Sequence, residues 1–317
     1  MGDPLGMDPR PTDDELAFYS TPGPITDIRR HEAQLDGIPD DIRAIFQVVQ
    51  GVIVHDMWLG RYGVEANPGQ MWSGTFIDMD RLLDRIEELS PLPLTIPRSP
   101  QERVIACCRE FATLMCAILR YKGIPARGRC GFATYFADPG SYEDHWICEY
   151  WSAEECRWIM VDPQLDPFQQ SVVSLSGDPL DLTDEMFVNG GRAWKMCREG
   201  LADPTRFGIG ADPQVFGLET LYGLWFVRGN LLRDIASVNK VETVPYLACV
   251  ARGGSWDSWR LVGARDDQLT DADYALLDEV ADALCRDDGG FSRATTLFRE
   301  HNGLRPPGPM IRNDALE

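Results

Sequence analysis

Three chemically distinct side chains between residues 107 and 166 constrain this chain more than any other feature. Cys108 stands near the start of an expected helix, and His145 and Asp162 stand on two expected strands that follow it. A thiol, an imidazole and a carboxylate can act as nucleophile, base and orienting acid only where the fold brings them within hydrogen-bonding reach. We therefore expect this helix to pack against these strands.

The helix is expected over residues 107–121, because apolar side chains recur there at helical spacing. Gly123 should end it, since glycine readily takes the left-handed conformation that follows many helices. Cys108 would then lie at the positive end of the helix dipole, which favours the thiolate. Alternatively, Cys107, Cys108 and Cys116 are simply small apolar residues of a core helix.

Residues 99–102 have the form of a capping box with proline at the first helical position, which predicts a helix that begins at Pro100. It either continues into the 107–121 helix or breaks near Ala106.

Strand-like alternation runs over residues 127–136, 145–151 and 157–162. If the last two runs pair as a hairpin, the numbers of paired residues sum to about 307. A shift of this register by two residues would keep His145 and Asp162 on one face of the sheet, whereas a shift by one residue would separate them. The unshifted register places His145 opposite Asp162, close enough to hydrogen-bond. Alternatively, His145 is a structural histidine and Asp162, which precedes Pro163, only starts a turn. The other histidines are His31, His55 and His301, none with a strand-borne acidic partner.

The stretch contains a series of short motifs in a fixed order. They are Cys108-Arg109-Glu110-Phe111-Ala112, Leu119-Arg120, Gly123-Ile124-Pro125-Ala126-Arg127, His145 with Glu149, and Trp158 with Val161-Asp162-Pro163. In this order and spacing the stretch resembles the transglutaminase-like superfamily, and most of the chain resembles a bacterial subgroup of it. The departures are Ala106 where the subgroup commonly has glycine, a second cysteine at 107, Trp146 directly after His145, and Gln164 after Pro163.

The resemblance implies an α+β fold with a papain-like core. A helix bearing the nucleophilic cysteine would pack on an antiparallel sheet bearing histidine and aspartate, with additional N- and C-terminal helices. It also implies a triad of Cys108, His145 and Asp162 that transfers acyl groups through a thioester, either to water or to an amine. The match to Cys-Arg-acid-Phe-Ala selects Cys108 over Cys107.

The backbone N–H of Cys108 would supply one oxyanion donor, and the sequence does not identify a second. Trp146, Tyr135 and Gln164 are candidates to line the substrate cleft, although each is equally consistent with a core or edge position. The acyl donor would be a small molecule, a peptide or a carrier-bound thioester, and the acceptor water or an amine. A catalytically silent binding or scaffold protein with the same fold is the alternative function.

Composition excludes several classes of function. The formal net charge of −20 argues against nucleic acid and anionic membranes, and it suits a neutral or cationic substrate, or simply a solvated acidic surface. No Cys-x-x-Cys or paired histidine predicts a metal site, and no cofactor is expected. No apolar run approaches the ~20 residues that span a bilayer. The polar start of the chain and nine cysteines without a disulfide framework predict a cytoplasmic protein with free thiols.

We expect residues 1–24 to be a flexible N-terminus, 25–304 a single domain with its core at 98–168, and 305–317 a flexible tail. Further helices are expected over residues 39–59, 78–89, 183–197, 218–241, 270–285 and 291–300. The 218–241 helix and the residues after it carry an unusually polar set, either a cleft lining or a solvent-facing stripe: Arg228, Asn230, Arg233, Asp234, Asn239 and Glu242.

Overall fold

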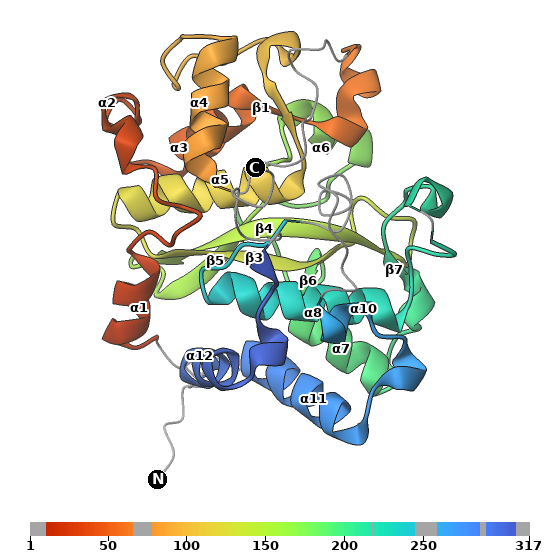
Figure 1. Cartoon of the computed structure of the whole chain (residues 1–317). Helices are drawn as coiled ribbons and strands as arrows, with labels where there is room; N and C mark the ends of the chain where they lie inside the picture. Colours follow the sequence, from red (N-terminus) through yellow and green to blue (C-terminus); the bar gives the residue numbers. More distant parts are fainter. Residues whose placement is uncertain (1–10, 66–77, 217, 245–258, 286–289, 309–317) are drawn as a thin grey trace.

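The computed structural model describes residues 11–65, 78–216, 218–244, 259–285 and 290–308. A five-stranded sheet lies between two layers of helices (Figure 1), and the expected α+β fold is confirmed. The strands β5, β4, β3 and β6 follow one another across the sheet and are antiparallel, while β7 pairs in parallel with β4. Their bounds are β3 Ala126–Ala133, β4 Tyr142–Ser152, β5 Arg157–Val161, β6 Phe187–Asn189 and β7 Phe207–Gly208.

Helix α5, Cys108–Tyr121, covers one side of the sheet (Figure 1). It begins where predicted because Cys107 has an extended backbone and its N–H donates to Glu110 Oε2 at 3.0 Å, which caps the helix. Of the two alternatives left open by the sequence, the chain breaks near Ala106. The predicted helix from Pro100 is wrong, since only the 3₁₀ turn Pro100–Glu102 forms before strand β2, Val104–Ala106.

Strand β2 pairs in parallel with β1, Ile53–His55. The helix predicted over residues 39–59 is therefore too long. Helix α3, Ile42–Val52, ends at the extended residue Ile53, and after β1 a 3₁₀ helix covers Asp56–Tyr62. Hydrogen bonding between two short strands overrides the helical pattern that continues past residue 52.

The register between β4 and β5 differs from the prediction by two residues. Cys148 pairs with Val161, so that paired numbers sum to 148 + 161 = 309. Strand β5 ends at Val161, and Asp162 lies just beyond the ladder. A two-residue shift keeps every side chain on its expected face, so His145 and Asp162 still point to the same side.

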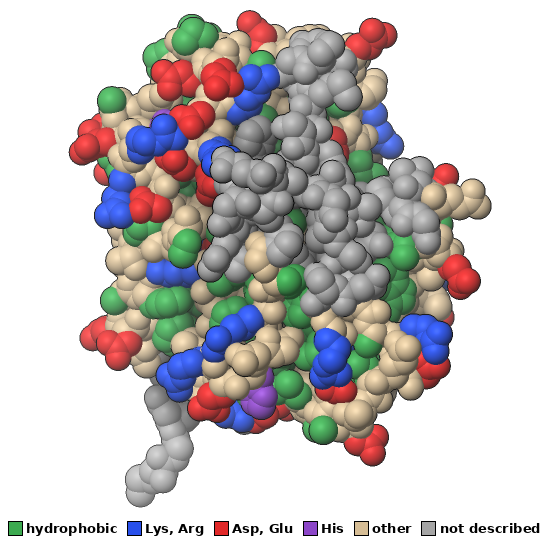
Figure 2. All heavy atoms as spheres, in the orientation of Figure 1, with side chains coloured by type: hydrophobic (Ala, Val, Ile, Leu, Met, Phe, Trp, Pro, Cys, Tyr) green, Lys and Arg blue, Asp and Glu red, His purple; other side chains and the backbone are tan. Residues whose placement is uncertain are grey.

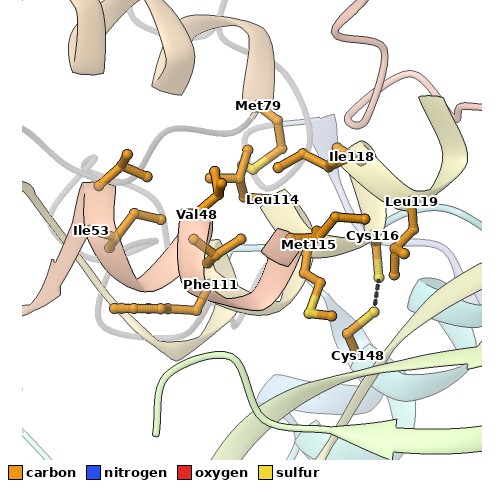
Figure 3. Packing of buried hydrophobic residues seen from close by; sticks show 14 of the residues in the cluster. Val48, Ile53, Met79, Phe111, Leu114, Met115, Cys116, Ile118, Leu119 and Cys148 are labelled. Atoms are coloured by element: carbon orange, nitrogen blue, oxygen red, sulfur yellow. Dashed lines mark hydrogen bonds between the residues drawn. The ribbon is translucent and has the colours of Figure 1, made fainter. Parts of the chain in front are cut away.

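The helices α3, α4 and α5 share a hydrophobic core with the sheet, shown from close by in Figure 3. Phe111, Leu114 and Ile118 of α5 are almost fully buried there. On the sheet side of the same helix, the Cys116 sulfur lies 3.1 Å from the Cys148 sulfur of β4, with both thiols free. This packing fixes the orientation of α5, and hence of its N-terminus, over the sheet.

The opposite layer contains α7, Gly190–Arg198, and α8, Leu224–Val238, which lie on the far side of the sheet from α5 (Figure 1). The helix predicted over 183–197 is partly wrong, because Phe187–Asn189 is strand β6. Helix α7 starts at Gly190, where an added Cβ would lie 2.7 Å from the Asn230 carbonyl oxygen. Gly190 and its neighbour Gly191, which carry no side chain, thus allow α7 to pack closely against adjacent helices and do not weaken it.

Most residues of the polar set around α8 neither face solvent nor line a cleft. Arg228, Asn230, Arg233, Asp234 and Glu242 are at most 1% exposed. They pair with groups far away in the sequence, as in the contact of Asp234 with Arg129 at 2.9 Å. Burial of these charges is tolerated because each is paired.

Part of the N-terminal segment expected to be flexible is packed. Residues Asp13–Tyr19 form helix α1, and the Tyr19 hydroxyl, on a side chain that is 1% exposed, donates to the Val238 carbonyl at 2.8 Å. Residues 1–10 and the end of the expected C-terminal tail, 309–317, lie outside the described ranges.

The remaining helices agree closely with the predicted spans where these were given. They are α2 Glu32–Leu35, α4 Met79–Leu89, α6 Pro167–Val173, α10 Arg260–Gly263, α11 Asp271–Cys285 and α12 Gly290–Glu300, with 3₁₀ turns at Arg29–His31, Pro204–Arg206, Pro213–Phe216, Asp266–Gln268 and Asn302–Leu304. Within the described ranges, no helix combines the length and the apolar character needed to cross a membrane. Acidic and basic side chains are interspersed over the described part of the face in Figure 2.

Candidate active site

The imidazole of His145 and the carboxylate of Asp162 meet as expected. His145 Nε2 lies 2.8 Å from Asp162 Oδ2, and the two residues are 2% and 0% exposed. Strand β4 supplies the histidine, and the aspartate follows β5 directly. Because the carboxylate can only accept, Nε2 carries the proton, and the other ring nitrogen, Nδ1, is left for a different partner.

Cys108 is placed to be that partner. His145 and Cys108 line the same cavity, and each favours the charged form of the other. The sulfur therefore lies at the start of α5, beside an imidazole that a buried carboxylate orients. Backbone N–H groups in the first turn of a helix have no partner within the helix, so the N–H of Cys108 is available to a bound ligand.

The Asp162 carboxylate accepts three hydrogen bonds. Besides His145, the hydroxyl of Tyr135 donates to Oδ2 at 2.7 Å and the backbone N–H of Gln164 donates to Oδ1 at 2.9 Å. Burial and the adjacent Asp162 charge raise the pKa of Tyr135, so its hydroxyl stays protonated and continues to donate. These three donors fix the plane of the carboxylate and therefore the orientation of the imidazole.

A second histidine lies beside the same sulfur. His55 lines the same cavity as Cys108 and helps to lower its pKa, and the Nδ1 atom of His55 lies 3.0 Å from Asp56 Oδ1. With Nδ1 committed to Asp56, Nε2 remains to face the sulfur. Cys108 thus lies between two imidazoles, each bound on its far nitrogen by a carboxylate.

The electrostatics of this arrangement favour a thiolate on Cys108. The hydrogen bond from Cys107, together with those from His145 and His55, holds the pKa of Cys108 well below that of an ordinary thiol, although burial opposes the charge. Burial also opposes charge on His145, but Asp162 and the Cys108 sulfur outweigh it and raise the pKa of His145 to about 10. For His55 the same balance, with Asp56 as the main anion, raises its pKa to about 9.

The neighbouring thiol of Cys107 has the opposite environment. It lies 3.0 Å from Glu110 Oε2 and also against the Cys108 sulfur, and both acceptors favour keeping its single S–H protonated. Contact with Cys108 and burial raise the pKa of Cys107 well above its usual range. Of the two adjacent cysteines, residue 108 is therefore the one placed to ionise.

These side chains open onto one cavity of about 290 Å³. Cys108 and His145 line it together with residues from several separate segments, as follows: His55, Asp56, Met57, Trp58, Arg61, Cys107, Phe136, Glu143, Asp144, Gln164, Ile209, Gly210 and Phe226. The reactive sulfur is thus accessible from a pocket and not only from the core.

The three residues predicted to line the cleft have different positions. Gln164 lines the cavity. Tyr135 instead bonds to Asp162, as described above. Trp146 is fully buried and packs with Cys108 and Cys130 behind the sulfur, and neither it nor Tyr135 is among the residues that line the cavity.

One wall of the cavity is acidic. Glu143 accepts a hydrogen bond from the Gly210 N–H at 2.8 Å, and burial raises its pKa to about 7. Its neighbour Asp144 is held by Arg233 at 3.0 Å and by Asn230 at 2.7 Å. Two members of the α8 polar set thus support the site from behind.

His55 and Asp56 are the site residues that sequence reasoning missed. The segment reads as the end of an amphipathic helix, and only the parallel pairing of His55 with Ala106 brings it beside Cys108. The available signal was weak: a histidine next to an aspartate, directly after a run of β-branched residues.

Comparison with known proteins agrees with the central part of this site. Residues 97–163 match the model of the transglutaminase-like superfamily. The comparison with curated proteins gives no match. Among solved structures, a candidate cysteine protease from Cytophaga hutchinsonii aligns with 20% sequence identity and a TM-score of 0.29, covering 49% of this chain and 43% of that chain. The chain thus spans less than half the length of that protein, and at this TM-score the likeness supports no inference about shared architecture.

Proposed function

Because its central segment makes this chain a member of the transglutaminase-like superfamily of papain-like cysteine enzymes, we propose that it transfers acyl groups through a thioester on Cys108. The observation that carries the proposal is the contact chain from Cys108 through His145 to Asp162, at the wall of a cavity. A thiolate, a general base and an orienting carboxylate in this order are the requirements for nucleophilic catalysis by cysteine.

In the first step, the Cys108 thiolate attacks the acyl carbonyl carbon, a C–S bond forms and the carbonyl π electrons move to oxygen. The tetrahedral intermediate then collapses, and the leaving group departs with the proton of His145 Nδ1. In the second step, water or an amine gives a proton to His145 and attacks the thioester. The second collapse releases the acylated acceptor and restores the Cys108 thiolate.

We propose amides, peptides and carrier thioesters as donor classes, with water or an amine as acceptor. The acidic wall formed by Glu143 and Asp144 supports a neutral or cationic substrate. The formal net charge of −20 supports a partner that is neither nucleic acid nor an anionic membrane. The eight free cysteines of the described residues support a reducing compartment such as the cytoplasm.

The test is intact-protein mass spectrometry after incubation with amide, ester and carrier-thioester donors. We expect an acyl mass shift that maps to Cys108, is absent from Cys108→Ala and is retained by Cys107→Ala. An adduct on Cys107 would show that the other thiol is the nucleophile. If no donor class modified the protein, a catalytically silent binding protein would be the better account.

A further inference from the structure

His55 is held at the site by elements that do not belong to the triad. It ends β1, where it pairs with Ala106, two residues before Cys108. Its ring stacks on that of Phe111 in α5, with centroids 6.4 Å apart and an interplanar angle of 21°. The side chain is buried yet reaches the cavity. Such placement from two sides leaves the ring little freedom to turn.

Asp56 fixes which nitrogen of His55 meets the sulfur. The carboxylate oxygen Oδ1 lies 3.0 Å from Nδ1, and the Met57 N–H donates both to this oxygen, at 2.7 Å, and to Nδ1, at 3.2 Å. The remaining nitrogen, Nε2, faces Cys108. The charged and titratable groups around His55 are thus Asp56 from its own segment, Cys107 and Cys108 from the start of α5, and His145 across the sulfur.

Building on the proposed function, we propose that the Nε2–H of His55 is the side-chain donor that stabilises the oxyanion formed when Cys108 attacks an acyl carbonyl. The backbone N–H of Cys108 would be its partner donor. Negative charge lies on the sulfur before attack and on the carbonyl oxygen after it, two bonds away across the new C–S bond and the C–O bond. A cation that lies beside the sulfur is therefore close to the place where the charge arrives.

The two histidines have different roles because only one of them has to transfer a proton. As the C–S bond forms, no proton has to move, and His55 keeps its proton throughout. The leaving group needs a proton at collapse, which His145 gives and later recovers from the acceptor. Asp56 favours the protonated form of His55, and the resulting pKa of about 9 keeps this donor charged at neutral pH. A residue that holds its proton so firmly suits a fixed donor better than a shuttle.

Two reactions of the Cys108 sulfur can distinguish a His55 that stabilises the oxyanion from a His55 that only stabilises the thiolate. Alkylation by iodoacetamide passes through no oxyanion, whereas acylation by p-nitrophenyl acetate does. Each rate constant is divided by the fraction of thiolate taken from the pH profile of alkylation. We expect His55→Leu to lower the corrected acylation rate by about 10²- to 10³-fold and to leave corrected alkylation within about threefold of the wild type. His55→Gln, whose amide N–H can reach the same place without a charge, should lie between the two.

His31→Leu is the matched control, since His31 is also buried and lies 3.2 Å from Asp80, away from the cavity-lining residues. It should change neither corrected rate. The inference would be overturned if His55→Leu lowered the corrected rates of acylation and alkylation equally, or if it lowered neither rate. A wild-type protein that is alkylated but never acylated would instead refute the proposed function.

If His55→Leu fails to fold, Asp56→Asn provides the test. It leaves the imidazole in place and removes the anion that stabilises its protonated form. Because a raised pKa is lost with the carboxylate, the donor should lose its proton at lower pH. Corrected acylation should therefore decline at a lower pH than in the wild type, where the decline is expected near pH 9. Identical profiles for the two proteins would overturn the inference.

Discussion

Replacing His145 with alanine should make the Cys108 thiol markedly harder to ionise. In the folded protein, Cys107, His145 and His55 all lower the pKa of Cys108. A hydrogen bond to a charged group is worth about 1.5–3 kcal/mol, and one pKa unit corresponds to about 1.4 kcal/mol. Loss of the His145 contact should therefore raise the pKa of Cys108 by about one to two units, with His55 still in place.

The sign of the pH dependence follows from the two shifts. The pKa of Cys108 is lowered, so its thiolate persists at acidic pH and is lost as the pH falls through that value. The pKa of His145 is raised to about 10, so its imidazolium is lost only as the pH rises through about 10. The ion pair exists between these limits. At pH values below the pKa of wild-type Cys108, His145→Ala should reduce the thiolate fraction, and with it the alkylation rate, by about 10- to 100-fold, and the midpoint of the labelling profile should rise by about one to two pH units.

The assay is the rate of iodoacetamide labelling between pH 5 and pH 9, followed by mass spectrometry of the peptide that contains Cys108. The exposed thiol of Cys156 serves as the internal reference in each sample, because it is remote from the cavity-lining residues. Its labelling should be the same in both proteins. The reasoning is refuted if the pH midpoint of Cys108 labelling is the same in His145→Ala as in the wild type, or if wild-type Cys108 behaves like Cys156.

Three further outcomes are expected. Asp162→Asn should reduce acylation less than His145→Ala does, because it disturbs the orientation of the base without removing it, which single-turnover rates would compare. Cys108→Ala should abolish acyl-adduct formation and keep the circular dichroism spectrum, whereas Cys107→Ala should keep most of the activity. Glu242→Gln should lower the free energy of unfolding, measured in urea, by about 3–5 kcal/mol, because it leaves a fully buried arginine without its anion.

Matched comparisons decide these outcomes. Glu155→Gln removes one of the two carboxylates that pair with the half-exposed Arg157, the other being Asp181, and should change stability by less than about 1 kcal/mol. A cost for Glu242→Gln as small as this would contradict the buried pairing. Full turnover in Asp162→Asn would show that the carboxylate does not orient the imidazole, and an active Cys108→Ala would move the nucleophile elsewhere.

The catalytic stretch could be predicted from the sequence because its signals are local. A helix start and two alternating runs lie within about sixty residues, and each constrains the face on which its side chain points. The hairpin register was wrong by two residues because the ladder stops at Val161 and the turn contains Cys156 in a left-handed conformation, with φ at 54°. The register of this hairpin depends on the conformation of the turn, which the alternation of side chains does not predict.

The missed parts of the site depend on contacts between distant residues. His55 reaches Cys108 only because β1 and β2 pair, which joins Ile53 to Val104. Two strands of three residues each carry no recognisable period. The polar set around α8 was misinterpreted for the same reason, since the residues that pair with Arg233 and Asp234 lie 89 and 105 positions away along the chain.

The buried arginines of the family segment have a practical consequence for engineering. Arg109 and Arg120 donate to Glu242, and Arg129 donates to Asp234, so their acceptors lie far outside residues 97–163. A fragment excised at those bounds would take Glu242 from Arg120 and would leave Arg109 and Arg129 with Glu110 and Glu149 as anionic partners. Anyone who wishes to graft this chemistry onto another scaffold, or to exchange it between relatives, must transfer the downstream helix and the residues that follow it together with the triad.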